Sequence, residues 1–151
     1  MKSVTVRKLP GHTYTMEMDN GRHLVVMDED LEDGGEDLGP TPSEMLLSAL
    51  GGCTAITALM YARRKGWLVE DITVSLTHDK IDPRTSDAFT AEEIENAGPT
   101  GKLDLIRMTL LVKGDLDAEQ RARLLEIANR CPVHRLIDLR PKITSELIRV
   151  E

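Results

Sequence analysis

The stretch that decides the fold is GPTPSEMLLSALGGC, residues 39–53. Thr41, Pro42 and Glu44 have the spacing of a helix start. Thr41 is the predicted capping residue, Pro42 occupies the first helical position, and Glu44 reaches back to the capping amide. Apolar residues then recur at spacings of three and four, which is the periodicity of a helix. The residues between them are also mostly apolar, so we expect a helix that is buried on more than one side and ends near Gly66.

This predicted helix carries Cys53, one of two cysteines in the chain, directly behind Gly51 and Gly52. A cysteine on an apolar helix face is most often a small buried hydrophobic residue. Each glycine inside a helix, however, costs roughly 1 kcal/mol relative to alanine. Two in succession therefore need a reason, such as close approach of another backbone or a kink beside a site. We expect Cys53 to lie at a crowded junction rather than in the bulk of the core.

The segments on either side of this helix predict an α+β domain that covers residues 1–151. Three β-rich segments before the helix indicate a meander with an acidic loop after it: 3–7, 14–18 and 23–28, then the loop 28–40. The elements expected after the helix are strands over 72–78 and 103–113, a helix over about 117–130, a short helix or turn to about 139, and a strand over 143–150. Residues 82–101 are predicted to form a long loop, with a short helix as the alternative. The order βββ-α-β-β-α-β favours a largely antiparallel sheet.

Composition and charge exclude several classes of function. The net charge of −7 over 151 residues argues against nucleic acid or an anionic membrane as a partner. We expect no bilayer-spanning segment, for which an apolar run of about 18 residues would be needed. The first ten residues carry charges where a signal peptide would be apolar, so we expect a cytoplasmic location. Two cysteines in a reducing compartment are more often reactive or simply buried than a permanent disulfide.

The second cysteine, Cys131, precedes Pro132. A residue before proline is pushed out of the helical region, so Cys131 is predicted to stand where one helix ends and a short one begins. Arg130, His134 and Arg135 could add a positive field that favours its thiolate; the alternative is that the arginines face solvent. Cys131 and His134 form one short-spaced pair, whereas structural zinc sites usually show two. We therefore expect neither a metal site nor a hydrolytic Cys–His pair.

Residues 39–53 and the run RCPVHR, residues 130–135, together resemble the OsmC/Ohr family of thiol-dependent hydroperoxide reductases. The resemblance implies an OsmC-like fold in an intertwined homodimer, with the first long helix at the centre, the sheets outside and the active site at the subunit interface. It implies that the Cys53 thiolate attacks the peroxide and becomes a sulfenic acid. Cys131 then condenses with it into an intrasubunit disulfide, which an external dithiol reduces, in some members a lipoyl group. No bound cofactor is implied.

The resemblance also implies an arginine, held by a glutamate, that keeps the peroxidatic thiol ionised. The candidates are Arg22 and Arg7, from the same or the partner subunit. The acid expected directly after the helix-starting proline is replaced by Ser43, and the nearest acid is Glu44. Nine residues separate Glu44 from Cys53, which places them about 180° apart around a regular helix. Glu44 therefore either holds the arginine as well as capping the helix, or only caps the helix.

These observations predict a cytoplasmic homodimer that reduces organic hydroperoxides to alcohols. Because Ser43 departs from the peroxidase pattern, two alternatives stay open: a non-catalytic dimer that binds a small apolar ligand, and a thiol-based redox sensor. The local sequence makes Cys131 the more readily ionised thiol, whereas the resemblance assigns the attack to Cys53. The prediction follows the resemblance.

Overall fold

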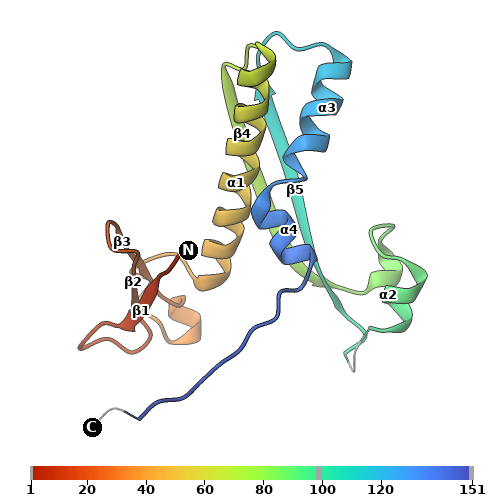
Figure 1. Ribbon diagram of the computed structural model, residues 1–151. Coiled ribbons are helices and arrows are strands. Elements are labelled where there is room, and N and C mark those ends of the chain that lie inside the picture. Colours follow the sequence, from red (N-terminus) through yellow and green to blue (C-terminus); the bar gives the residue numbers. More distant parts are fainter. Residues whose placement is uncertain (1, 98–99, 150–151) are drawn as a thin grey trace. The chain divides into compact units, whose positions relative to one another are not determined.

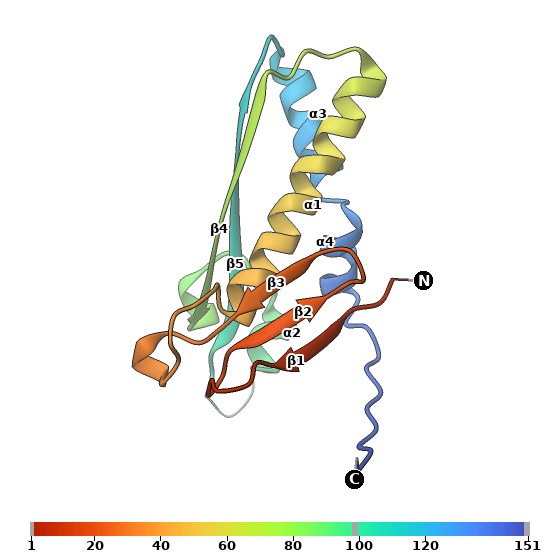
Figure 2. The same ribbon diagram turned by 90° about the vertical axis from the view of Figure 1, so that its left-hand side faces the viewer.

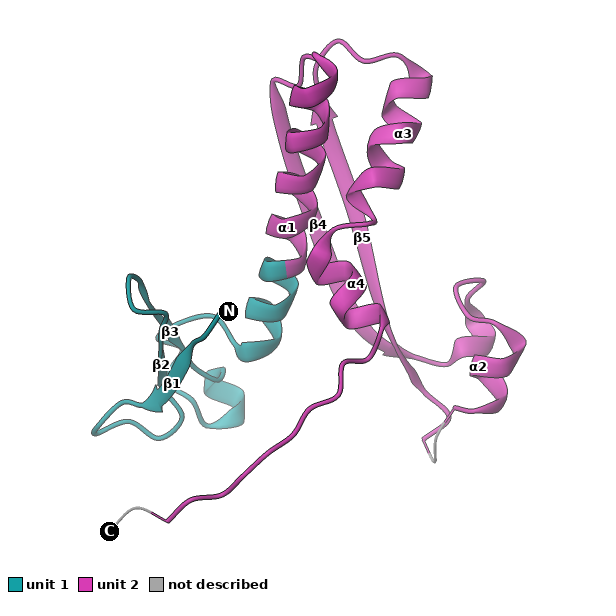
Figure 3. Cartoon of the chain, viewed as in Figure 1, with its two compact units in different colours: residues 1–49 teal, residues 50–151 magenta. Residues whose placement is uncertain are grey.

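The computed structural model describes residues 2–97 and 100–149, and the chain divides into two compact units, residues 1–49 and 50–151 (Figures 1 and 3). Each unit is described by itself. The strands are β1 (Thr5–Lys8), β2 (Met16–Asp19), β3 (Leu24–Met27), β4 (Asp71–Ile81) and β5 (Leu103–Lys113). The helices are α1 (Pro42–Lys65), α2 (Ala91–Glu95), α3 (Ala118–Ala128) and α4 (Pro132–Asp138), with short 3-10 turns at Leu31–Asp33 and Pro83–Thr85. The fold is α+β with antiparallel sheets, as predicted.

Unit 1 holds the predicted meander, a three-stranded antiparallel sheet in the order β1-β2-β3. The strands are short, and Val6 and Leu24 are more than half exposed. Between residues 2 and 49, the buried side chains are Thr15 and Asp28, and both are polar. Unit 1 therefore has a sheet without a hydrophobic core of its own.

The Asp28 carboxylate organises the acidic loop that follows β3. Its Oδ1 accepts a hydrogen bond from the amide of Glu29 at 2.9 Å. Its Oδ2 accepts from the hydroxyl of Thr15 at 3.1 Å and from the amides of Glu36 at 3.2 Å and Leu38 at 3.3 Å. Burial by itself raises the pKa of Asp28, but these four hydrogen bonds outweigh burial and hold the pKa below its usual value. An ionised carboxylate thus takes the place of an apolar core here.

Unit 2 is built on a long antiparallel hairpin, in which β4 and β5 pair from Asp71 with Lys113 to Ile81 with Leu103. Side chains alternate between the two faces of a strand, and one face of the hairpin is apolar and more buried. Its cross-strand pairs are Ile72 with Val112, Val74 with Leu110, and Leu76 with Met108. Figure 2 shows the hairpin running alongside α3 and the unit 2 part of α1. The apolar face meets these helices.

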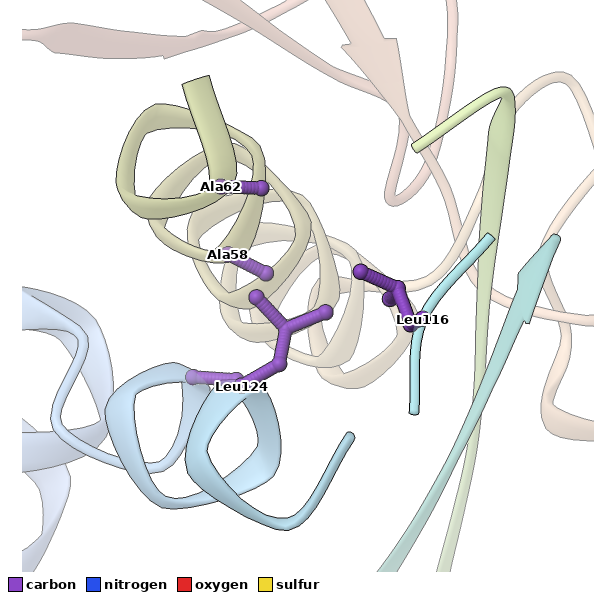
Figure 4. Packing of buried hydrophobic residues seen from close by; sticks show 5 residues of the cluster. Ala58, Ala62, Leu116 and Leu124 are labelled. Carbon is purple, nitrogen blue, oxygen red and sulfur yellow. The ribbon is translucent and has the colours of Figure 1, made fainter. Parts of the chain in front are cut away.

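The core of unit 2 is small and lies where α1, α3 and the end of β5 converge (Figure 4). Leu124 of α3 points at Ala58 of α1, and Leu116 reaches the same helix from the segment after β5. Ala58 and Ala62 are almost completely buried. Small residues on this face of α1 let the larger leucines of the neighbouring segments fill the space between them.

Both ends of α1 form as the sequence predicts. The Thr41 amide donates to Glu44 Oε2 at 2.8 Å, and the Glu44 amide donates to Thr41 Oγ1 at 3.3 Å, which is a capping box. At the other end Gly66 has φ +69°, the left-handed conformation that ends many helices. Its amide donates to the carbonyl of Arg63.

The two glycines of α1 have different surroundings within this chain. A Cβ on Gly51 would lie 2.7 Å from Cδ1 of Leu76 in β4, so Gly51 makes room for a side chain of the hairpin. A Cβ on Gly52 would meet no atom within 4 Å. Nothing in the described part of this chain explains a glycine at position 52.

Two predictions for the second half of the chain need correction. The segment 82–101 is not a plain loop: it contains α2, which Thr90 caps in a second capping box, so the short-helix alternative was the right one. The strand predicted over 143–150 is absent between residues 143 and 149, and residue 150 lies outside the described residues. Ile143, Leu147 and Ile148 are largely exposed. A β-rich segment stays irregular when no sheet edge pairs with it.

One helix, α1, is long and apolar enough to cross a bilayer by length and composition alone, although no bilayer-spanning segment is expected from the sequence. α1 has 24 residues, and its most apolar window has a mean hydropathy of 1.6. The central helix of a globular domain meets the same criterion. Leu50, Gly51, Thr54, Ala58 and Ala62 of α1 are buried within the fold, as expected for a core helix.

We expect Leu124→Ala to lower the free energy of unfolding by about 2–5 kcal/mol, because it leaves a cavity against Ala58. Its neighbour Leu125 is 49% exposed, whereas Leu124 is 2% exposed. Leu125→Ala should therefore cost less than about 1 kcal/mol. Denaturant unfolding of the two variants measures the difference, and equal losses would contradict this packing.

Asp28→Asn should destabilise the protein at neutral pH, because an amide nitrogen cannot accept the hydrogen bonds that converge on the carboxylate. The folded pKa of Asp28 is lowered from an unfolded value of about 3.9. Its contribution is therefore complete above that value and is lost as pH falls through the lower, folded pKa.

Unfolding measured from neutral pH down to about pH 2 should then show a weaker acid destabilisation in Asp28→Asn than in the parent. Asp30→Asn is the control, since Asp30 caps the nearby 3-10 turn without a side-chain hydrogen bond. Identical pH profiles for the parent and Asp28→Asn would show that Asp28 does not hold this loop.

Candidate functional site

Cys131 stands at the junction of α3 and α4, where the sequence places it. α3 ends at Ala128, and Cys131 is the extended residue that caps α4, with φ −62° and ψ 150°. Pro132 occupies the first helical position, where a missing amide hydrogen costs nothing. The side chain of Cys131 has no exposed surface. The chain therefore turns sharply around a buried sulfur.

Several donors surround the Cys131 sulfur. The amide of His134 donates to Sγ at 3.3 Å. The Thr54 hydroxyl of α1 lies 3.5 Å from the same atom. The Cys53 thiol and the amide of Val133 also lower the pKa of Cys131, so both lie close to this sulfur. Cys53 and Cys131, far apart in the sequence, thus come close together where α4 lies beside α1 (Figure 1).

These contacts change the acidity of Cys131. Burial by itself raises the pKa of this thiol, but hydrogen bonds from Thr54, His134, Cys53 and Val133 outweigh burial and hold the pKa below its usual value. The sequence also predicts a lowered pKa for Cys131, but it attributes the lowering to basic neighbours. The structure gives a different cause, because Arg130 is mostly exposed and pairs with Glu126 at 2.5 Å.

Cys53 differs from Cys131 in exposure. It lies on α1 with its side chain half-buried, and both cysteines carry free thiols. Cys53 is partly exposed to solvent, whereas Cys131 is enclosed. The pair therefore consists of one accessible thiol and one protected thiol with a lowered pKa.

Sequence reasoning missed Thr54, which follows Cys53 directly. Its side chain is completely buried. The signal was a hydroxyl-bearing residue on the buried face of an apolar helix, three residues after Gly51 and four before Ala58. A buried hydroxyl needs a hydrogen-bond partner, and here that partner is Cys131.

The other predicted site residues lie in unit 1, whereas both cysteines lie in unit 2. Arg7 on β1 forms an ion pair with Glu17 on β2. Arg22 lies in the turn between β2 and β3, and its amide donates to Asn20 Oδ1 at 3.0 Å. The Glu44 carboxylate accepts hydrogen bonds from the amide and hydroxyl of Thr41. Arg7, Arg22 and Glu44 thus belong to a different unit from the cysteines, and the roles of these three residues remain predictions.

His134 has a buried Nδ1 without a hydrogen-bond partner in the part of the chain that the structure describes. The same part of the chain contains no group of three or more His, Cys, Asp or Glu side chains placed to hold a metal. A separate cavity of about 460 Å³ lies between β5 and α3, and Met108, Leu110, Val112, Leu124 and Leu125 form its apolar lining. Neither cysteine lines this cavity.

Comparison with known proteins supports the fold. Residues 34–146 match the family model of the OsmC-like protein, a match that crosses from unit 1 into unit 2. No functionally curated protein matches the chain.

Solved structures give the same result. The OsmC-like protein from Mycoplasma pneumoniae has a TM-score of 0.68 at 16% identity, covering 91% of this chain and 87% of that one. The organic hydroperoxide resistance protein OsmC from Legionella pneumophila has a TM-score of 0.60 at 15% identity, with coverages of 89% and 88%. The organic hydroperoxide resistance protein OhrB of Bacillus subtilis has a TM-score of 0.58 at 16% identity, with coverages of 89% and 88%. At these identities the likeness establishes the fold, and with the match over residues 34–146 it shows that the chain belongs to the OsmC-like protein family.

Proposed function

We propose that this protein reduces organic hydroperoxides to alcohols through Cys53 and Cys131. The observation that carries the proposal is a pair of free thiols, Cys53 partly exposed and Cys131 enclosed, in which Thr54, the residue after Cys53, lies 3.5 Å from the Cys131 sulfur. The family relationship supports the substrate class, because OsmC-like structures include organic hydroperoxide resistance proteins. No bound cofactor is needed for this chemistry.

Cys53 would be the attacking residue. Its thiolate attacks the distal peroxide oxygen, the O–O bond breaks, and the alkoxide takes a proton and leaves as the alcohol. Cys53 is then a sulfenic acid. The Cys131 thiolate attacks the Cys53 sulfur, the S–O bond breaks, and hydroxide leaves and is protonated to water. The product is a disulfide, and an external dithiol, with a lipoyl group as one candidate, restores both thiols by exchange.

The difference in exposure favours this division of roles. Cys131 is the thiol with the lowered pKa, so acidity alone would make it the first nucleophile. A bulky organic peroxide, however, must reach the sulfur that it oxidises, and Cys131 has no exposed surface. The enclosed thiol is better placed to attack a sulfur already beside it. Cys53 is therefore the peroxidatic residue in this proposal, and Cys131 resolves the sulfenic acid.

A cation near Cys53 would keep its thiol ionised. Arg22 remains the first candidate, and Arg7 the second, supplied by the same or the partner subunit. Glu44 is proposed as the acid that orients the arginine, in addition to its capping bonds to Thr41. Loss of peroxidase activity in Arg22→Gln but not in Arg7→Gln would identify the cation.

We also propose that the working unit is an intertwined homodimer in the cytoplasm, in which each complete chain forms a single OsmC-like domain. The unexplained Gly52 lies on an exposed face of α1 together with Ile56, Leu59 and Met60. A glycine on such a stripe lets a second helix approach closely, and the surrounding apolar side chains gain by being covered. A second copy of α1 fits both features.

The sheet of unit 1 and the C-terminal segment also expose apolar side chains to solvent. Unit 1 has a sheet but no buried apolar side chain between residues 2 and 49. Residues 143–149 are unpaired and expose three apolar side chains, those of Ile143, Leu147 and Ile148. A unit of this size rarely holds a fold without a larger core. Pairing with a second copy would provide both the missing core and a sheet edge for the C-terminal segment.

One equivalent of cumene hydroperoxide should convert the reduced protein to a species lighter by two hydrogens, measured by intact mass spectrometry, with both thiols lost. A dithiol should restore the mass and support repeated turnover. Because Cys53 carries the attack, Cys53→Ser should not turn over peroxide. Cys131→Ser should stop at a sulfenic acid that a dimedone probe traps.

Turnover by Cys53→Ser at the parent rate would exclude the mechanism. An unreactive Cys53 would favour the ligand-binding alternative. Disulfide formation without repeated turnover would favour the redox sensor.

The dimer should be visible by sedimentation or light scattering as twice the chain mass. Ile56→Asp places a charge on the exposed stripe of α1 and should shift the protein toward the monomer or unfold it. Leu111→Asp is the control, since Leu111 is 62% exposed and Ile56 is 59% exposed, but Leu111 points away from the helices on the other face of β5. A monomeric parent, or equal effects of the two variants, would contradict the arrangement.

A further inference from the structure

We propose that Thr54 is a positioning residue for disulfide formation: its hydroxyl holds the Cys131 sulfur against Cys53 and donates a hydrogen bond to it while it attacks. The proposal rests on the proposed function for the step that it serves. Thr54 itself forms no bond to the substrate and is neither oxidised nor reduced.

A buried hydroxyl at position 54 carries a cost. Thr54 shares the buried face of α1 with Leu50, Gly51 and Ala58, where an apolar residue would fill the space without penalty. A buried hydroxyl without a partner costs free energy. The partner that the structure gives to the Thr54 side chain is the Cys131 sulfur, at 3.5 Å. The hydroxyl is therefore explained by the sulfur rather than by packing.

Ionisation of Cys131 fixes the direction of its hydrogen bond with Thr54. A protonated Cys131 could donate to Thr54 or accept from it, but a thiolate can accept and not donate. As Cys131 ionises, Thr54 must donate, and the His134 amide donates to the same sulfur at 3.3 Å. The two donors come from different helices, α1 and α4, and together they fix where the sulfur lies.

The charge on Cys131 changes during disulfide formation. Cys131 carries a negative charge before it attacks and none once the S–S bond has formed and hydroxide has left the Cys53 sulfur. A hydrogen bond to a charged acceptor is stronger than one to a neutral acceptor. Thr54 therefore stabilises the attacking form of Cys131 more than the product, and it increases the fraction of Cys131 that is ready to react.

Two opposing effects determine how much the loss of the Thr54 hydroxyl should slow disulfide formation. Losing one hydrogen bond to a charged group should raise the pKa of Cys131 by about one unit, which lowers the thiolate fraction by up to about tenfold at a pH below that value. A more basic thiolate is intrinsically more nucleophilic, by about threefold per unit. The loss of thiolate is the larger effect. Ionisation alone then predicts disulfide formation about three- to fourfold slower at neutral pH.

The test compares Thr54→Val, which keeps the shape and removes the hydroxyl, with Thr54→Ser, which keeps the hydroxyl. In a Cys53→Ser background Cys131 is the remaining cysteine, and the ultraviolet absorbance of its thiolate reports its titration without requiring access to the sulfur. A Cys53→Ser/Cys131→Ser chain supplies the tyrosine background. The titration midpoint should rise by about one pH unit in Thr54→Val and return toward the parent in Thr54→Ser.

With both cysteines present, Thr54→Val should form the sulfenic acid at the parent rate and the disulfide several-fold more slowly at neutral pH. The difference in this rate between Thr54→Val and the parent should shrink as pH rises above the pKa of Cys131, because Cys131 is then fully ionised in both proteins. A merely structural role would lower stability without moving this pH profile. More sulfinic acid should also accumulate in Thr54→Val at excess peroxide.

An unchanged titration midpoint in Thr54→Val would overturn the role of Thr54, whether or not the protein turns over peroxide. A slower disulfide step in Thr54→Ser equal to that of Thr54→Val would overturn it as well. The titration uses no peroxide, so a parent protein that fails to reduce peroxides would refute the proposed function while the hydrogen bond could still be measured.

Discussion

A helix that is apolar around its whole circumference has to be covered on every side, and the structure of unit 2 follows from that requirement. The buried residues of α1 lie on one face of the helix, and three elements cover successive parts of that face. The hairpin covers the part where Gly51 admits Leu76, and α3 covers the part where Leu124 meets Ala58 (Figure 4). The start of α4 covers a third part through the contact between Thr54 and Cys131. The side that carries Gly52 has no cover within the described chain, and it is the side on which a second copy of α1 would pack.

The same packing explains how a thiol with a lowered pKa can exist inside a protein. Burial opposes ionisation, so an enclosed sulfur needs donors that do not depend on solvent. Backbone amides at a chain turn supply two of them, and α1 supplies a hydroxyl and the second thiol. Cys131 thus obtains its acidity from the junction of two helices rather than from a charged side chain. Cys53, on the more open side of the contact, keeps access to solvent.

Local chemistry predicted the features whose causes are local. The capping box of α1, its glycine end and the turn at Cys131 all depend on residues within a few positions of one another, and each lies where expected. The meander and the hairpin strands follow in the same way from alternation and turn residues. Features that depend on distant partners were missed or misread. Thr54 has a partner that no local pattern reveals, and the segment 143–149 has strand-forming residues but no edge to join.

The Asp28 carboxylate, which organises unit 1, affects how far the sequence of this unit can change among homologues. Three of the four donors to Asp28 are backbone amides, those of Glu29, Glu36 and Leu38. Every amino acid except proline supplies such a donor. The path of the chain between Asp28 and Pro40 therefore depends on one acid and on backbone geometry, and hardly on which side chains the amides carry. Homologues could replace most of the acidic surface here and retain the same path, provided that they keep the aspartate and admit no proline at those three positions.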